Sequence, residues 1–261
     1  MSSTILREID IPDDITLEEM VSFRDQLSPN VRDDWILVLT SVLVSCHHGP
    51  ETIIHLYELA FSSSSSSCTT EDLASVSKSI QRQIQEVLVK ASVIFGIPPS
   101  LDTIFALLTH LRSHYPSTYL LNSTDFSRSP ILPSPISSLT TPAHEALRRV
   151  YRHNLDDILH NKMADNMQDL KFLTLEINYG FNLANESVID WKQTELVVLA
   201  ALIGQNCRAE VLWHMRGALR AGWTREDVQS VREVCLKVAK RLRVRCEKVP
   251  RLQEVNEESN D

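Results

Sequence analysis

Apolar side chains recur every three to four residues along most of this 261-residue chain. Residues 100–115 (SLDTIFALLTHLRSHY) and 141–163 (TPAHEALRRVYRHNLDDILHNKM) show this spacing, with charged residues between the apolar ones. The spacing matches the helical turn of 3.6 residues. Clear apolar–polar alternation, which is typical of strands, is absent from the sequence, so the pattern predicts an all-α fold.

Two helix starts are predicted from capping residues. Thr141 followed by Pro142 combines a capping hydroxyl with a proline at the first helical position. Thr224 is followed by the acids Glu226 and Asp227, which suit the positive end of a helix dipole.

Two stretches interrupt the helical pattern. Residues 61–70 (FSSSSSSCTT) form a serine run that cannot bury apolar surface, which predicts a mobile serine loop at 62–70. Residues 122–142 contain four prolines and many hydroxyl side chains, which predicts a linker between two lobes.

An internal repeat lies on either side of this linker. Residues 34–46 (DWILVLTSVLVSC) align without gaps on 195–207 (ELVVLAALIGQNC), and each segment starts with an acid and ends with a cysteine. Residues 51–55 (ETIIH) then match 210–214 (EVLWH).

The repeat continues with a third pair of segments, 69–76 (TTEDLASV) and 224–231 (TREDVQSV). Agreement at several elements in the same order predicts two homologous helical lobes, a degenerate first one at residues 1–121 and a second one at 143–248. An acidic tail at 249–261 follows them.

Composition narrows the classes of function. The chain has 26 Lys and Arg against 34 Asp and Glu, and this net charge of −8 argues against nucleic acid or an anionic membrane as the main partner. No apolar run is long enough to predict a membrane-spanning helix. Six glycines are few for the glycine-rich turns of a Rossmann or barrel fold.

The cysteines and the chain ends bear on the compartment. Five scattered cysteines without a CxxC pair predict reduced thiols. The first 15 residues resemble neither a secretory signal nor a transit peptide, and the final Ser-Asn-Asp is not a peroxisomal address. By elimination we expect the cytoplasm, with mitochondria and peroxisomes left open.

Three chemically capable residues share one face of a predicted helix in the second lobe. Cys207, Glu210 and His214 are spaced i, i+3 and i+7. Asn206 is the expected N-cap after a break at Gly204. Cys207 would then lie in the first turn, where the helix dipole stabilises a thiolate.

Glu195 precedes this face on another predicted helix and reaches His214 only if the two helices pack antiparallel. Such packing would create an acid/base pair beside a polarised thiol. A structural interpretation stays open, because a lone histidine on an apolar helix is more often a satisfied core residue. A lone cysteine is usually a small buried hydrophobe.

The second lobe resembles the carboxymuconolactone decarboxylase and alkylhydroperoxidase D (AhpD-like) superfamily. The resemblance rests on the segments EALRRVYRHNLDDIL, INYGFNL, DWKQTELVVLAALIG and HMRGALRAGWTREDVQSV. The family pattern that follows the glutamate reads here His214, Ala218, Gly222, Thr224, Glu226 and Asp227. The layout is similar to that of two-repeat fungal members and implies an AhpD-like helical fold.

The resemblance favours decarboxylase-type acid/base chemistry on a small organic acid or lactone, the reaction of a lyase. Glu195 would be the general base or orienting acid and His214 the proton carrier, while Cys207 and Glu210 would shape the pocket. The expected substrate-binding residues are Arg208, Arg216 and Trp213. The family's usual arginine before the helix glutamate is Thr194 here, which weakens the case for lactone chemistry.

Peroxidase members of this family use a glutamate, a CxxC pair and a histidine. Glu195, Cys207 and His214 occupy matching positions, but Glu210 replaces the second cysteine. A carboxylate cannot form a disulfide, and it should raise the pKa of the Cys207 thiol. A thiol-dependent hydroperoxide reductase therefore ranks third, behind a non-catalytic oligomeric helical scaffold of the same fold.

The first lobe contains a weaker copy of the constellation, with Asp34, Cys46 and His55. Two inserted residues rotate His55 around the helix relative to the cysteine, so we expect a degenerate, mainly structural site. No metal and no cofactor are expected. The family resemblance implies a small-molecule substrate and a homo-oligomer.

Overall fold

The computed structural model describes residues 14–65, 70–122, 125, 127–128, 136–163 and 167–256. These residues form helices and connecting segments without strands, which confirms the predicted all-α fold. The first half contains α1 (Leu17–Asp25), α2 (Pro29–Arg32), α3 (Trp35–Ser45), α4 (Gly49–Ser64), α5 (Thr70–Phe95) and α6 (Ile97–His114). The second half contains α7 (Thr140–Tyr151), α8 (Asn154–Asp156), α9 (Gln168–Phe172), α10 (Trp191–Gly204), α11 (Arg208–Arg220) and α12 (Arg225–Arg241).

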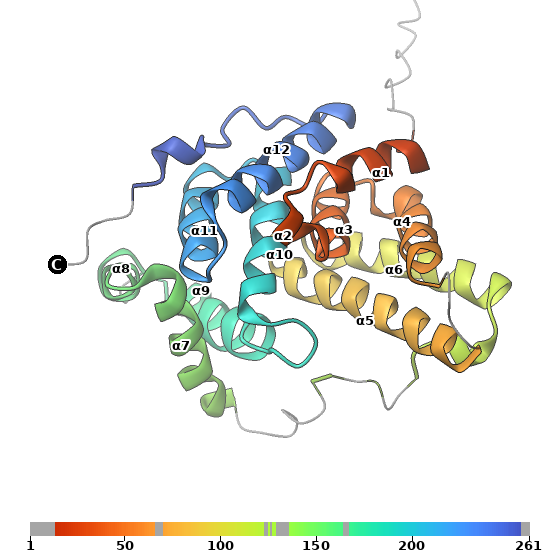
Figure 1. Ribbon diagram of the computed structural model, residues 1–261. Coiled ribbons are helices and arrows are strands. Elements are labelled where there is room, and N and C mark those ends of the chain that lie inside the picture. Colours follow the sequence, from red (N-terminus) through yellow and green to blue (C-terminus); the bar gives the residue numbers. More distant parts are fainter. Residues whose placement is uncertain are drawn as a thin grey trace, which may run out of the picture.

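The repeat appears as two corresponding sets of three helices. In the first lobe α3 packs on α4 and α5, and in the second α10 packs on α11 and α12. Figure 1 shows the first lobe in red to yellow and the second in green to blue, meeting where α3 and α10 lie side by side. The two lobes therefore meet at the centre of the molecule, where α5 also contacts α10 and α3 also contacts α12.

The α3–α10 pair forms the core because both helices are apolar on nearly all sides. Every residue of α3 is buried, as is every residue of α10 from Thr194 to Gly204. A helix of this kind is stable only inside a protein. The Ser41 hydroxyl donates to the Val197 carbonyl and the Ser45 hydroxyl donates to the Ala201 carbonyl, both at 2.6 Å.

Of the helix starts predicted at Thr224 and Thr141, the structure confirms the first and not the second. Thr224 is the N-cap of α12 and forms a reciprocal capping box with Asp227, as predicted. The expected cap at Thr141 is wrong, because α7 already begins at Thr140 after a 3₁₀ turn. The start is moved by tertiary packing, since the Thr140 hydroxyl donates to Glu176 at 3.0 Å.

Two predicted irregular segments are partly ordered. α4 extends through Ser64, so the first part of the serine run is helical, and the Ser63 hydroxyl donates to the Leu59 carbonyl. Residues 66–69 lie outside the described part of the chain. In the predicted linker, Arg128 is buried against Glu86, while residues 129–135 again lie outside the described ranges.

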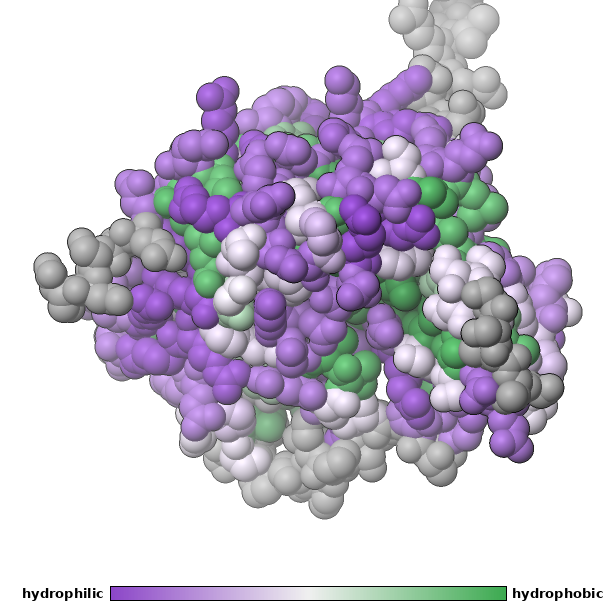
Figure 2. Space-filling model, viewed as in Figure 1, coloured by the Kyte–Doolittle hydropathy of each residue, from purple (hydrophilic) through white to green (hydrophobic). Residues whose placement is uncertain are grey.

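Two segments of the second lobe wind as π-helices, which the sequence pattern did not predict. These are η5 (Asp157–Lys162) and η6 (Leu173–Leu183). The wider turn is rare in proteins and is often found near functional sites. Figure 2 shows mainly hydrophilic residues over the visible face, with smaller hydrophobic areas between them. Among the described residues, no helix has both the length and the apolar character needed to span a membrane.

Candidate functional site

The candidate site is built on a buried pair formed by Glu195 and His214. Glu195 lies in the second turn of α10 and His214 lies in α11, which packs against α10. Glu195 Oε2 is 2.9 Å from His214 Nδ1, and the two side chains are only 3% and 5% exposed. The predicted acid/base pair therefore exists as a direct hydrogen bond inside the protein.

Space for the Glu195 carboxylate comes from Gly217, one turn after His214. A Cβ atom at Gly217 would lie 3.0 Å from Glu195 Cδ and closer still to Oε2. It would also approach the Val150 side chain of α7 at 3.3 Å. The absence of a side chain at this position thus allows α10, α11 and α7 to close around the carboxylate.

Two tyrosines that residue spacing does not reveal complete the surroundings of the pair; Tyr179 is buried and Tyr151 is partly buried. The Tyr151 ring contacts the His214 ring edge-to-face with centroids 6.3 Å apart, and its hydroxyl is 3.4 Å from the Tyr179 hydroxyl of η6. Burial, with a smaller effect of Glu195 and Glu210, raises the pKa of Tyr151 to about 12. Tyr151 is therefore a neutral phenol at physiological pH.

The tyrosines could have been noticed from the sequence. Both lie inside segments that carried the family resemblance, Tyr151 in EALRRVYRHNLDDIL and Tyr179 in INYGFNL. Those segments indicate the fold, and their residue spacing does not point to a role for either tyrosine. Their approach to His214 depends on the contacts of α7 with α11 and η6, which no local pattern encodes.

Cys207 differs from its predicted setting. The N-cap of α11 is Cys207 itself, without a side-chain capping bond, so the expected cap at Asn206 is wrong. Asn206 instead has φ of 57° and accepts a hydrogen bond from the Lys248 backbone N–H at 2.8 Å. Partial burial and the nearby Glu210 carboxylate raise the pKa of the Cys207 thiol, with Lys248 opposing them.

Glu210 and Cys207 are more exposed than the buried pair. Glu210 is exposed and Cys207 is partly exposed, whereas His214 is buried. Cys207 precedes His214 by seven positions, or about 10 Å along the helix axis. The shared helix face predicted for the three residues therefore runs from the surface at Cys207 to the interior at His214.

The predicted substrate-binding arginines have partners in the C-terminal segment. Arg208 pairs with Glu254, and Arg216 Nε donates to the Asn256 carbonyl at 3.2 Å. These partners lie far along the chain, so residue spacing on α11 could not reveal them. Trp213, by contrast, packs edge-to-face on Tyr151 at 5.5 Å between centroids and so borders the site.

The first-lobe copy does not reproduce the pair. The Asp34 carboxylate accepts a hydrogen bond from Gln193 at 2.6 Å, and His55 Nδ1 lies 3.3 Å from the Ile15 carbonyl. Cys46 is buried, and burial raises the pKa of its thiol to about 12. Each residue thus has a separate structural environment.

No group of three or more His, Cys, Asp or Glu residues within the described ranges has a geometry suited to a metal ion. Burial raises the pKa of the Cys46 and Cys235 thiols, with a smaller effect of Cys246 on both and of Cys46 on Cys235. Cys246, from the segment after α12, packs against the end of α10, and its Sγ is 3.3 Å from the Ile203 carbonyl.

Part of the second lobe matches a known protein family. The model of the carboxymuconolactone decarboxylase family matches residues 171–239, which include η6, α10, α11 and most of α12. Peroxisomal protein 2 of Schizosaccharomyces pombe is 25% identical over 172 residues, covering 65% of this chain and 75% of that protein. Peroxisomal protein 2 of Saccharomyces cerevisiae is 29% identical over 79 residues, covering 30% of this chain and 28% of that protein.

No solved structure matches the chain. The family match includes both members of the buried pair, Gly217 and Tyr179. The resemblance to the carboxymuconolactone decarboxylase family is thereby confirmed, and residues 171–239 of the second lobe carry it.

Proposed function

We propose that the chain catalyses decarboxylase-type acid/base chemistry on a small organic acid or lactone. The observation that carries this proposal is the buried hydrogen bond between Glu195 and His214. Because the carboxylate accepts from Nδ1, it fixes the orientation of the imidazole and leaves Nε2 as the nitrogen that exchanges a proton. This arrangement suits a proton carrier held by an orienting acid.

The proposed reaction is loss of carbon dioxide followed by protonation of the substrate carbon. The bond between the substrate carbon and its carboxylate breaks, carbon dioxide leaves, and the electron pair remains on the carbon. His214 Nε2 delivers a proton to that carbon, and Glu195 stabilises the imidazolium before the transfer. Tyr151, which keeps its proton because burial raises its pKa to about 12, donates a hydrogen bond to a substrate oxygen.

A carboxylate substrate also needs a cation. Arg208 can bind the substrate carboxylate only if it releases Glu254, its present partner at the surface. Such an exchange costs little, because both side chains are exposed and exposed ion pairs contribute about 1 kcal/mol or less. We therefore keep Arg208 as the proposed substrate cation and assign Arg216 to the contact with the Asn256 carbonyl.

Two alternatives predict different results. A non-catalytic scaffold would keep Glu195 and His214 as a satisfied buried pair without turnover. A thiol-dependent hydroperoxide reductase would need a reactive Cys207, and the raised pKa of this thiol argues against it. Only the acid/base proposal predicts that activity requires His214 and does not require Cys207.

The test measures carbon dioxide release from carboxymuconolactone and a panel of small lactones and β-keto acids. His214→Gln should reduce the rate by about 100-fold or more, the usual contribution of a positioned acid/base group. Cys207→Ser should stay within about threefold of the parent, because the thiol takes no part. Absence of turnover by the parent chain would support the scaffold, and hydroperoxide reduction lost in Cys207→Ser would support the thiol enzyme.

We also propose a homo-oligomer, supported by a run of exposed apolar side chains in the second lobe. These are Met167, Leu170, Phe172 and Leu173 of α9 and its flanks. Large apolar groups grouped on a surface commonly mark an interface. Sedimentation equilibrium should give a mass above that of one 29.6 kDa chain, and Leu170→Glu should lower it towards the monomer.

We propose a peroxisomal location on the basis of the names of the two yeast relatives, in place of the cytoplasm expected by elimination. A fluorescent fusion expressed at native level should coincide with a peroxisomal marker. A diffuse cytoplasmic signal would contradict this location.

A further inference from the structure

Two neighbouring hollows follow one face of α5, away from Glu195 and His214. The first has a volume of about 280 Å³ and an apolar lining from Leu88, Val89, Ile97, Leu101 and Ile104. The second has a volume of about 370 Å³ and a charged lining that includes Arg82, Glu86, Asp125 and Arg128. Both are lined by Gln85 and Val89, so they adjoin along α5 and together form one groove, apolar at one end and charged at the other.

The apolar end exposes side chains that are normally buried. Val89, Ile97 and Leu101 are all exposed, and they come from two helices that meet at this hollow. Exposing apolar area to water is unfavourable relative to burying it. A grouped apolar surface that forms a hollow rather than a bulge is typical of a ligand site.

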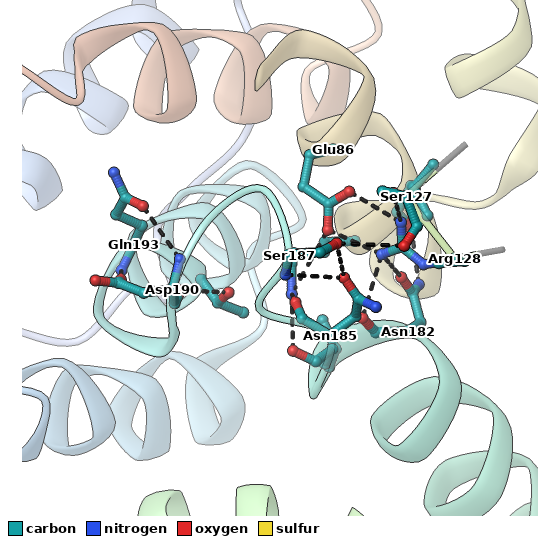
Figure 3. Close-up of polar contacts among 12 residues, drawn as sticks. Glu86, Ser127, Arg128, Asn182, Asn185, Ser187, Asp190 and Gln193 are labelled. Atoms are coloured by element: carbon teal, nitrogen blue, oxygen red, sulfur yellow. Dashed lines mark hydrogen bonds and ion pairs between the residues drawn. The ribbon is translucent and has the colours of Figure 1, made fainter. Parts of the chain in front are cut away.

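The charged end has a fixed wall. Arg128 donates to both Glu86 oxygens, with its two terminal nitrogens each 2.9 Å from one of them, and both residues are buried. Figure 3 shows Glu86 and Arg128 pointing toward one another, with Asn182 beside the guanidinium. Lys90 is buried behind them and donates to the Leu183 and Asn185 carbonyls at 2.8 and 2.7 Å. These bonds join α5 to the end of η6 and make the wall rigid.

One donor of this wall lacks a partner within the described structure. Arg128 Nε is buried and makes no hydrogen bond there, although its two terminal nitrogens do. A buried unsatisfied donor is costly, and this one is enclosed within the wall, so it does not itself reach an occupant of the hollow.

The rim of the charged end is positive on balance. Arg82 is exposed and pairs with Asp125, and Lys78 acts on the same Asp125 carboxylate. Among the residues that line this hollow Arg82 and Arg128 balance Glu86 and Asp125, so the surplus positive charge comes from Lys78, which lies near Asp125 outside the lining. Arg82 uses one of its five N–H donors on Asp125 and can donate to a second carboxylate with the others.

We infer that this groove binds a single-chain amphiphile with a carboxylate head, such as a medium-chain fatty acid. The carboxylate lies at Arg82 and the Arg128 wall, and the unbranched tail crosses Val89 into the hollow between α5 and α6. The occupant is a small molecule, because the two hollows together have the size of a small-ligand pocket. The inference does not depend on the proposed decarboxylase-type function, since neither hollow is lined by Glu195 or His214.

The test is isothermal titration of the full chain with decanoate and with decanol. Decanoate should bind at least tenfold more tightly than decanol, because only the carboxylate meets Arg82. Leu101→Glu should weaken decanoate binding at least tenfold by placing a charge in the apolar hollow. Leu17→Glu is the matched control, since Leu17 is a similarly exposed leucine of α1 (45% against 43% for Leu101), and it should bind as the parent does.

A second variant separates the head-group contact from loss of folding. Asp125→Asn should tighten decanoate binding about two- to fivefold, because it releases Arg82 from its present partner. A destabilised protein would not bind more tightly. Equal binding of decanol and decanoate, no binding by the parent, or unchanged binding in Leu101→Glu would each overturn the inference.

Discussion

At the scale of single residues, two carboxylate–imidazole pairs in this chain differ mainly in burial. Glu195 and His214 are 3% and 5% exposed, whereas Glu58 and His110 are 36% and 15% exposed. Removing one partner of a buried pair leaves a desolvated charge, while an exposed partner regains water. The same substitution should therefore have very different consequences at the two sites.

We expect His214→Ala to lower the free energy of unfolding by about 3 kcal/mol. His110→Ala, its matched control in the first lobe, should lower it by about 1 kcal/mol or less. Urea unfolding followed by circular dichroism at pH 7 measures both. Equal losses in the two variants would show that Glu195 is better hydrated than its burial implies.

Gly217 permits a test that separates activity from stability. In Gly217→Ala the new Cβ meets the Glu195 carboxylate, which has to move away from His214. The decarboxylation rate should fall at least tenfold, while alanine's better helix propensity, about 1 kcal/mol, offsets part of the strain. Unfolding and turnover are measured on the same preparation, and unchanged turnover would contradict the assigned role of the pair.

The predictable part of the site is the part encoded by local spacing. Glu195 and His214 follow from the repeat and from antiparallel packing of consecutive helices, and the structure brings them together. Tyr151 and the partner of Arg208 escaped notice because they depend on contacts with α7 and with the C-terminal segment. The spacing of residues on one helix does not indicate which distant segment of the chain packs over that helix.

At the scale of elements, the start of α12 joins the two lobes. Asp227 completes the capping box with Thr224 and also accepts from the Ser28 hydroxyl at 2.6 Å and from Asn30. Burial alone would raise the pKa of this carboxyl, but the hydrogen bonds from Ser28, Thr224 and Asn30 together outweigh burial and lower it. Relative to the protonated form, the ionised Asp227 carboxylate is therefore more stable in the folded state than in the unfolded state.

The lowered pKa of Asp227 gives a pH dependence with a defined sign. Its stabilisation is complete above the unfolded-state pKa of about 3.9 and is lost as the pH falls below it through the lower folded-state pKa. Asp227→Asn should cost about 1–2 kcal/mol at pH 7, and the gap from the parent should narrow towards pH 3. Urea midpoints of both proteins from pH 7 to pH 3 test this, and a constant gap would contradict it.

The positions of the helices were predictable from the sequence, but their type (α-helix or π-helix) and their end residues were less so. Apolar spacing identified α6 and α7, and residue chemistry identified the cap of α12 at Thr224. The same spacing cannot distinguish an α-helix from the π-helix at η6, because both keep apolar residues on one side. The helical start of the serine run follows from apolar residues of α4 that precede it, such as Leu59 and Ala60, and not from the serines themselves.

At the scale of the whole molecule, the lobes are halves of one core rather than independent domains. The buried residues of both lobes form a single apolar cluster. α3 and α10 approach closely because Gly204 has no side chain, and a Cβ there would lie 2.6 Å from Ser45 Oγ and 2.7 Å from Ser45 Cβ. Gln205 also donates to the Ser45 carbonyl at 2.9 Å.

This shared core predicts one cooperative unfolding transition. If α3 and α10 are each stable only against the other, neither lobe can unfold alone, and all probes should report the same midpoint. Trp35 reports on the first lobe and Trp191, Trp213 and Trp223 on the second, so single-tryptophan variants can follow each lobe separately by fluorescence during urea unfolding. Gly204→Val should lower the free energy of unfolding by about 1–3 kcal/mol through overpacking, and it should shift both midpoints together. Separate midpoints for the two lobes in the parent, or a shift confined to the second lobe in Gly204→Val, would show that each lobe is stable on its own.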